Sequence, residues 1–252
     1  MWTATTKRSS GSVGTGSVED MRLFIDTGEI SEVEEIAAWG VLSGATTNPS
    51  LLAKAEGDPG DIIRRICELV DGPTSAEVVS SDAKGMVTEG RALRTLHEHI
   101  VVKVPFSKEG LAATRELSAD GHPVNMTLVF TANQALLSAE AGATYISCFM
   151  GRLDDISVDS ASVVGEIVDA LRPGGYPQAQ VLAASLRNPE HLKTAAILGC
   201  EVATVPTPVL RAALAHPLTT SGIEKFTADW ETRPEFAEWL QQLTSSAQVA
   251  GR

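Results

Sequence analysis

The chain has 252 residues, 43% of them hydrophobic and 21% charged, a composition typical of a globular protein with a full core. Because 20 Lys and Arg residues face 32 Asp and Glu residues, the formal net charge is −12, and no overall basic field exists to attract nucleic acid or anionic lipid. No apolar run approaches the length that spans a bilayer and no signal-peptide centre is present, so we expect a cytoplasmic protein without nucleic-acid or membrane partners.

The chain divides into a leader and a long region in which two kinds of segment alternate. Residues 1–20 are rich in Ser, Thr and Gly and indicate a disordered leader. From residue 21 to residue 221, short apolar runs are each followed by a longer amphipathic segment. The runs begin near Arg22, Gly44, Ser75, Ile100, Val124, Tyr145, Gln180 and Val202. Eight such units predict an α/β protein with a closed (β/α)₈ TIM barrel, with an open doubly wound sheet as the alternative.

Helical spacing marks the segments that cover the strands. The clear ones are residues 31–39, 61–70, 82–97, 108–120, 131–141 and 189–198. Ser31 and Asp82 stand at expected N-caps, and Gly121, Gly142 and Gly199 stand just past helix ends. Two further helices, 222–230 and 234–243, predict that residues 222–252 form a C-terminal helical appendage.

One strand carries a lysine among β-branched residues. Residues 100–105 read Ile-Val-Val-Lys-Val-Pro, a run typical of a strand buried on both faces. Burial disfavours the charged form of an amine, which favours a neutral nucleophile that forms a Schiff base with a carbonyl substrate. The alternative is that Lys103 ends an edge strand and extends its amine to water.

The ends of the other strands bear on this choice, because catalytic groups of such a barrel converge at the C-terminal ends of its strands. Seven of the eight ends carry polar groups: Asp26; Thr46, Thr47 and Asn48; Glu77; Lys103; Asn125 with Thr127; Ser147 beside Phe149; and Ser185. Strand alternation points Met126 and Cys148 away from these side chains, so we interpret Cys148 as a packing residue.

Each polar residue also has a purely structural interpretation. Asp26 is a plausible cap, the segment from Thr47 to Ser50 a plausible turn, and Arg152 and Arg187 plausible surface arginines. Those interpretations leave unexplained why the polar residues gather at one end of the predicted strands. The common location therefore favours a functional site.

Metal and disulfide frameworks are not indicated. The three cysteines, Cys67, Cys148 and Cys200, are scattered without a C-x-x-C pair, which fits reduced, buried thiols. Three acidic residues, Asp154, Asp155 and Asp159, are a possible divalent-cation site, but we interpret them as a solvated acidic loop before the sixth helix.

Four segments occur in a specific order and spacing: Phe24-Ile25-Asp26-Thr27, Gly44-Ala45-Thr46-Thr47-Asn48-Pro49-Ser50, Val101-Val102-Lys103-Val104-Pro105 and Leu182-Ala183-Ala184-Ser185. With them the chain resembles the transaldolase family, including its short members and the fructose-6-phosphate aldolases, from about residue 22 to about residue 230. The resemblance implies an enzyme without metal or cofactor that moves a dihydroxyacetone unit through a lysine Schiff base. Its donor would be sedoheptulose 7-phosphate or fructose 6-phosphate and its acceptor an aldose phosphate.

The resemblance also implies roles for individual residues. Lys103 would attack the ketose carbonyl, Asp26 would take the hydroxyl proton as the carbon–carbon bond breaks, and Glu77 and Thr127 would hold a proton-shuttling water. The implied substrate-binding residues are Thr47, Asn48, Asn125, Ser147, Phe149, Arg152, Ser185 and Arg187. Within that set, Asn48, Asn125 and Ser147 would bind the dihydroxyacetone part, and Arg152, Ser185 and Arg187 the phosphate.

Two positions separate transfer from simple cleavage. The fructose-6-phosphate aldolases typically carry Gln at the position of Glu77 and Tyr at that of Phe149, and without that phenol transfer is favoured over release of dihydroxyacetone. Three alternatives stay open: an aldolase that releases dihydroxyacetone, a specialised transaldolase that makes an octulose phosphate for antibiotic biosynthesis, and a non-catalytic sugar-phosphate-binding barrel. Relatives are commonly homo-oligomers, so we expect one here, of a size that the sequence does not give.

Overall fold

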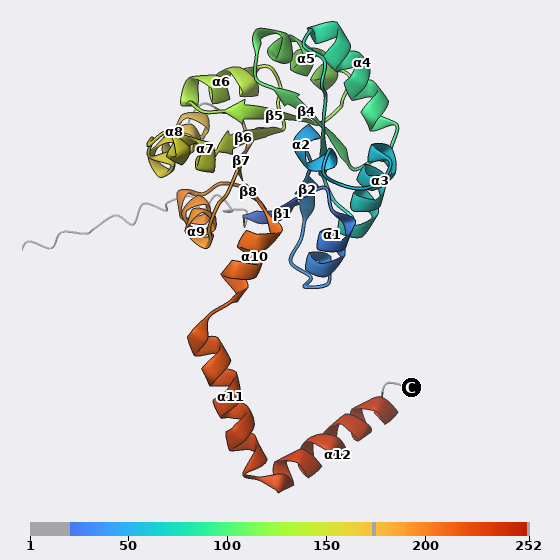
Figure 1. Cartoon of the computed structure of the whole chain (residues 1–252), viewed down its shortest axis with the longest axis vertical. Coiled ribbons are helices and arrows are strands. Elements are labelled where there is room, and N and C mark those ends of the chain that lie inside the picture. Colours follow the sequence, from blue (N-terminus) through green and yellow to red (C-terminus); the bar gives the residue numbers. More distant parts are fainter. Residues whose placement is uncertain (1–20, 173–174, 251–252) are drawn as a thin grey trace, which may run out of the picture. The chain divides into compact units, whose positions relative to one another are not determined.

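The computed structural model describes residues 21–172 and 175–250, so the expected leader, residues 1–20, lies outside the described residues. The chain forms two compact units, the first ending at Thr207 and the second beginning at Pro208. The first unit contains a closed barrel of eight parallel strands that follow one another in chain order (Figure 1). This closure confirms the predicted TIM barrel and excludes the open doubly wound sheet.

The strands lie close to the predicted positions. They are β1 (Arg22–Asp26), β2 (Gly44–Thr46), β3 (Thr74–Glu77), β4 (Ile100–Pro105), β5 (Val124–Val129), β6 (Tyr145–Phe149), β7 (Gln180–Ala184) and β8 (Val202–Val205). The barrel closes where β1 pairs with β8 as well as with β2, for example at Phe24, which lies opposite both Gly44 and Thr204.

Helices surround these strands (Figure 1). They are α1 (Ile30–Ala37), α2 (Pro49–Leu52), α3 (Pro59–Val70), α4 (Ala83–Arg94), α5 (Lys108–Ala119), α6 (Ala132–Glu140), α7 (Met150–Asp155), α8 (Ser160–Leu171) and α9 (Pro189–Leu198). The three predicted end glycines, Gly121, Gly142 and Gly199, have the positive φ angles expected of them.

The two predicted N-caps have different outcomes. Asp82 caps α4, since its Oδ1 accepts a hydrogen bond from the backbone nitrogen of Gly85 at 2.9 Å. The prediction for Ser31 was wrong, because α1 begins at Ile30 and Glu29 occupies the cap position without a side-chain bond. Thr27 Oγ1 instead accepts from the Glu29 nitrogen at 3.1 Å, so the hydroxyl that satisfies this turn comes from the end of the preceding strand.

The interpretation of Asp154, Asp155 and Asp159 as a solvated loop was right about their exposure but wrong about the loop for Asp154 and Asp155. Asp154 and Asp155 belong to α7, which follows β6 directly and buries Leu153 among other residues. Asp159 is the N-cap of α8 and accepts from the Ala161 nitrogen at 3.1 Å. In the described ranges, no group of three or more His, Cys, Asp or Glu side chains is arranged to hold a metal ion.

The side chains of β4 point alternately toward the surrounding helices and toward the barrel interior. Val102 and Val104 are buried against α4 and α5, whereas Val101 faces the barrel interior, where it packs with Phe24 and Tyr145 among others. Lys103, two residues beyond Val101, therefore also points inward, on the side of the strand ends. The apolar layer beneath it leaves the polar side chains gathered at the C-terminal ends.

The second unit contains most of α10 (Thr207–Leu214), with α11 (Pro217–Glu231) and α12 (Pro234–Ala250). It begins at Pro208, ahead of the expected boundary at residue 222. Helix α11 also begins five residues before its predicted start, at a first-turn proline preceded by His216, whose Nδ1 accepts from the Leu218 nitrogen at 3.2 Å. Among the described residues, no helix has both the length and the apolar composition needed to span a membrane.

Candidate active site

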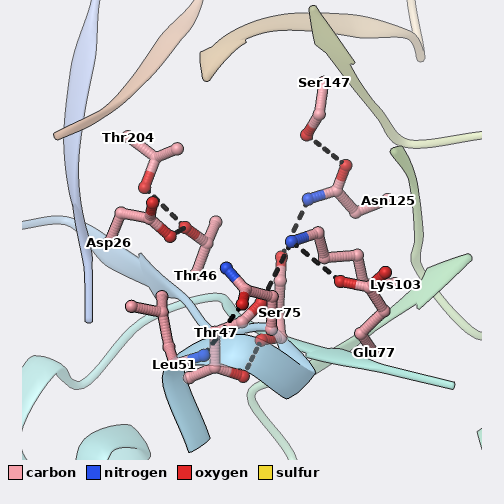
Figure 2. A network of polar contacts seen from close by, with 11 residues as sticks. Asp26, Thr46, Thr47, Leu51, Ser75, Glu77, Lys103, Asn125, Ser147 and Thr204 are labelled. Atoms are coloured by element: carbon pink, nitrogen blue, oxygen red, sulfur yellow. Dashed lines mark hydrogen bonds and ion pairs between the residues drawn. The ribbon is translucent and has the colours of Figure 1, made fainter. Parts of the chain in front are cut away.

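Lys103 lies at the centre of the polar network at the barrel mouth (Figure 2). Lys103 is only 5% exposed. Its Nζ lies 3.1 Å from Glu77 Oε2, and the same nitrogen donates to the backbone oxygen of Thr47 at 3.0 Å. Strand β4 pairs with β3 on one side and β5 on the other, which brings Glu77 and Asn125 beside Lys103. The alternative of an edge-strand lysine that reaches water is therefore wrong.

Asp26 enters the same site from β1. Thr46 Oγ1 donates to Asp26 Oδ1 at 2.7 Å, and the hydroxyls of Thr46 and Thr204 lie 2.7 Å apart, so the three side chains form a chain across β1, β2 and β8 (Figure 2). Burial raises the pKa of the Asp26 carboxyl above its ordinary value, and this effect exceeds the opposing ones of the Lys103 charge and the Thr46 hydrogen bond. Asp26 therefore holds a proton more readily than an exposed aspartate does.

A second chain of hydrogen bonds holds the other side of the mouth. Asn125 Nδ2 donates to Ser75 Oγ at 3.0 Å, and Asn125 Oδ1 accepts from Ser147 Oγ at 2.7 Å (Figure 2). Thr47 Oγ1 donates to the backbone oxygen of Ser75 at 2.8 Å. These four residues are buried, and their bonds fix the amide orientation of Asn125.

A cavity of about 610 Å³ and an inner recess of about 120 Å³ open at this mouth and share Asp26, Asn48, Lys103, Phe149, Arg152 and Ser185. Glu77, Thr127 and Arg187 line the larger space, and Ser147 lines the recess. Ten of the twelve predicted site residues therefore surround one space. The other two, Thr47 and Asn125, are fully buried. Thr47 accepts a hydrogen bond from Lys103, and Asn125 is hydrogen-bonded to Ser75 and Ser147.

Thr127 carries a hydroxyl that is ready for a ligand. Its Oγ1 is buried and has no hydrogen-bond partner in the part of the chain that the structure describes. The next residue, Leu128, has a φ of 62°, and the pairing of β5 with β6 shifts register between Met126 and Val129. A buried hydroxyl without a partner is costly, so a water or a substrate hydroxyl that bound here would satisfy it.

The cationic side of the cavity comes from α7 and from the segment after β7. Arg152, on α7, lies with its Cζ 5.2 Å from the centre of the Phe149 ring, and Arg187 Nη2 lies 2.8 Å from Asp155 Oδ2. Between them, the Gly151 nitrogen donates to the backbone oxygen of Ser185 at 3.0 Å, and Ser185 has a φ of 58°. Guanidinium groups from two elements thus face one space, as anion recognition requires.

Cys148 and Cys200 do not line this cavity. Cys148 is completely buried on the opposite side of β6 from Ser147, and burial raises the pKa of its thiol to about 12. The same cause raises the pKa of Cys200 to about 12. These thiols stay protonated at neutral pH, which confirms the interpretation of Cys148 as a packing residue.

Sequence reasoning missed two residues of the network, Ser75 and Thr204. Both stand on the inward face of a strand, Ser75 two residues before Glu77 and Thr204 between Ala203 and Val205. The available signal for Thr204 is a polar residue at an inward position of an otherwise apolar strand, and for Ser75 it is the position two residues before Glu77, on the same face of the strand. The last residues of each strand do not include Ser75 and Thr204, which support the site from within the strands.

Comparisons with known proteins agree with this arrangement. Residues 23–243 match the family model described as "Transaldolase/Fructose-6-phosphate aldolase". A "Probable transaldolase" of Thermus thermophilus is 50% identical over 220 residues, which cover 84% of this chain and 98% of the relative. A "Probable transaldolase" of Myxococcus xanthus is 49% identical over 218 residues, covering 86% and 98%.

Solved structures share the fold at much lower identity. The thiamine phosphate pyrophosphorylase of Pyrococcus furiosus aligns with a TM-score of 0.56 and 14% identity, over 78% of this chain and 93% of that one. At that identity the likeness concerns the barrel architecture alone.

Proposed function

Since the chain belongs to the transaldolase/fructose-6-phosphate aldolase family, we propose that it transfers a dihydroxyacetone unit from a ketose phosphate to an aldose phosphate through a Schiff base on Lys103. The observation that carries the proposal is the buried Lys103 amine, 3.1 Å from Glu77 in a cavity that Asp26 also lines. A buried amine, two carboxyl groups and an anion-binding side are the groups that this chemistry needs.

The first step is attack of the Lys103 amine on the ketone carbon of the donor. The amine must lose a proton before it attacks, and Glu77 is the carboxylate in contact with it. The carbinolamine then loses its hydroxyl as water, with a proton supplied from Glu77 through a water that the Thr127 hydroxyl would bind. The product is an iminium ion that draws electrons from the neighbouring carbon–carbon bond.

The second step is cleavage of that bond. Asp26 takes the proton of the hydroxyl on the far carbon, a carbonyl forms there, the bond breaks, and its electron pair passes to the iminium to give an enamine. Burial raises the pKa of Asp26, so it is a stronger base than an ordinary aspartate and can return the proton when the enamine attacks an acceptor aldehyde. Hydrolysis of the new iminium frees the product and Lys103.

Transfer requires that the enamine survive until the acceptor arrives. Release of free dihydroxyacetone instead requires protonation of the enamine carbon. Phe149 lines the cavity without a hydroxyl, and its ring centre lies 5.9 Å from that of Phe130. This supports a transferase over an aldolase that releases dihydroxyacetone.

The proposed phosphate site consists of Arg152, Ser185 and Arg187, which all line the cavity. Arg152 and Arg187 are the two arginines among its described lining residues. Donors of the fructose 6-phosphate or sedoheptulose 7-phosphate class fit two cations and a hydroxyl at this end. The acceptor is an aldose phosphate, and a longer product such as an octulose phosphate is the alternative outcome of an acceptor panel.

We also propose that the chain forms a homo-oligomer. Large apolar side chains stay exposed in the second unit, among them Phe226 on α11 and Trp239 on α12. Exposed apolar side chains in such number are typical of protein contacts. A monomeric mass in sedimentation equilibrium would contradict this assembly.

The test of the chemistry is borohydride trapping. The protein is incubated with fructose 6-phosphate and sodium borohydride and analysed by mass spectrometry with peptide mapping. We expect a reduced dihydroxyacetone-sized adduct on the peptide that contains Lys103, absent from Lys103→Met and retained in Lys54→Met, which removes another lysine that lines the cavity. A folded wild-type protein without the adduct, or an adduct that persists in Lys103→Met, would overturn the assignment.

A further inference from the structure

A hydrogen-bonded path joins α7 to the segment that follows β7. His191, in the first turn of α9, lies with its Nε2 2.9 Å from Asp154 Oδ2 on α7. The His191 side chain is 13% exposed and the Asp154 side chain 39% exposed, so this pair is better shielded than the Arg187–Asp155 pair beside it, whose side chains are more than half exposed. Asp154 Oδ1 also accepts from the Ser160 nitrogen at 3.3 Å, which ties the carboxylate to the start of α8.

The other nitrogen of His191 reaches the anion-binding segment. Its Nδ1 accepts from the backbone nitrogen of Arg187 at 3.3 Å. Because Nδ1 accepts, Nε2 must carry the ring hydrogen and donate it to Asp154, so the two partners together assign a single tautomer. The His191 ring is thus held at both ends, by a carboxylate on one side and by the backbone of Arg187 on the other.

We propose that Asp154 and His191 are positioning residues for the anion-binding arginines. Arg152 lies two residues before Asp154 on α7, and Arg187 is held through its backbone nitrogen, so one path of bonds sets both arginines relative to each other. The inference rests on the proposed function, in which these two arginines bind the substrate phosphate.

The hydrogen-bonded path matters because the arginine side chains' own contacts do not set the positions of their guanidinium groups. The ion pair of Arg187 with Asp155 is exposed, and exposed pairs contribute little to the geometry of long side chains. The position of the Arg187 guanidinium therefore depends on where its backbone lies. His191 bonds to that backbone, while the Asn188 side chain accepts from the His191 nitrogen at 2.9 Å and caps α9.

The experiment compares a phosphorylated donor with its unphosphorylated analogue. The ratio of kcat/KM on fructose 6-phosphate to kcat/KM on fructose reports on phosphate binding, since both sugars present the same reacting carbons. We expect His191→Phe to lower this ratio about fivefold to tenfold, mainly through KM for the phosphate ester, and to raise the inhibition constant of inorganic phosphate by a similar factor. Asp154→Ala removes the partner of His191 Nε2, so the ring hydrogen is no longer held on that nitrogen, and this variant is also expected to have a lower ratio.

His191→Asn keeps one of the two bonds, because its Oδ1 can replace Nδ1 as an acceptor for the Arg187 nitrogen while the bond of Nε2 to Asp154 is lost. We expect its ratio to match that of Asp154→Ala, which loses the same bond, and to lie above that of His191→Phe, which loses both. Equal losses on both sugars in His191→Phe, or an unchanged ratio, would overturn the proposal. A protein that is merely destabilised would lose activity on both sugars, so the ratio separates positioning from folding.

The same data separate this inference from the proposed function. If Arg187→Ala lowers the ratio and His191→Phe does not, the arginine binds phosphate and the positioning role is refuted. If Arg187→Ala leaves the ratio unchanged, the phosphate site itself is wrongly assigned and the positioning role is refuted with it. The borohydride adduct on Lys103 is expected in all these variants, because none of them contacts Lys103 in the described network.

Discussion

Gly151→Ala is expected to displace the anion-binding segment while leaving the Lys103 network in place. A Cβ at Gly151 would lie 2.3 Å from the backbone oxygen of Ser185 and 2.7 Å from both Cγ and Nε of Arg187. Carbon and oxygen approach each other to about 3.3 Å in ordinary close contacts, so the segment must move by about 1 Å. Ser185 has little freedom to yield locally, because its φ of 58° already lies in the left-handed region.

A misplacement of about 1 Å at a binding group costs about 100-fold in rate. We therefore expect kcat/KM on fructose 6-phosphate to fall about 100-fold in Gly151→Ala, with a much smaller loss on fructose. Overpacking of this kind also costs about 1–3 kcal/mol of stability. Steady-state kinetics on the two sugars and a thermal melt measure both effects.

Gly165→Ala is the matched control. Gly165 lies inside α8, and a Cβ there would meet only Leu198 Cδ2 at 3.6 Å, an ordinary contact. Alanine in a helix interior is more favourable than glycine by about 0.5–1 kcal/mol, so this variant should melt higher and keep its activity. If Gly151→Ala has a kcat/KM on fructose 6-phosphate within about twofold of that of Gly165→Ala, the close-approach argument is refuted.

Two further predictions concern the charged groups. Arg187→Ala is expected to weaken transition-state binding of phosphorylated donors by about 2–4 kcal/mol, and of fructose much less. Equal losses in kcat/KM on fructose 6-phosphate and on fructose would show that Arg187 is not part of the phosphate site. Asp26→Asn is expected to abolish turnover and yet to raise Tm at pH 8. Burial raises the pKa of Asp26, so the native state binds a proton that the unfolded state has lost, and stability falls as pH rises through that range. The Tm difference between Asp26→Asn and wild type should therefore shrink as pH falls toward the ordinary aspartate value of 3.8, and a difference independent of pH would contradict the assignment.

The strands and the convergence of polar side chains at their ends could be predicted because each depends on a short stretch of sequence. A β-branched run such as residues 100–105 specifies a buried strand, and alternation within it decides that Lys103 and Val101 share one face. The end of a strand then determines where its last polar residue lies. For this reason Asp26, Glu77 and Lys103 could be brought to one mouth before any contact was known.

The short helix α7 could not be predicted in the same way. It has six residues, too few for a helical period to stand out, and it begins directly after β6 with no side-chain cap. Its acidic residues therefore suggested a solvated loop. Asp154 proves to be structured by His191, which lies 37 residues further along the chain, a contact that no local pattern encodes.

The contact between two supporting residues of the site could not be predicted for a related reason. Thr46 and Thr204 are 158 residues apart in sequence, and their hydroxyls meet only because β1 pairs with both β2 and β8 when the barrel closes. A threonine in a strand is otherwise an ordinary β-forming residue. Its role beside Asp26 depends on closure, which is a property of the whole unit.

The site is therefore built on two kinds of support, and they divide its functions. Lys103, Glu77 and Asp26 stand on strands whose positions are set by backbone pairing along the barrel, which gives the proposed bond-breaking chemistry a rigid base. The proposed anion-binding side depends on a short helix, a left-handed Ser185 and side-chain bonds through His191. Under the proposed function, changes in those few contacts would alter which phosphate ester is accepted while Lys103, Glu77 and Asp26 stay in place. Substrate choice can consequently vary among chains that share the same strand residues, which is why the strands indicate the reaction and the loops must be tested for its substrate.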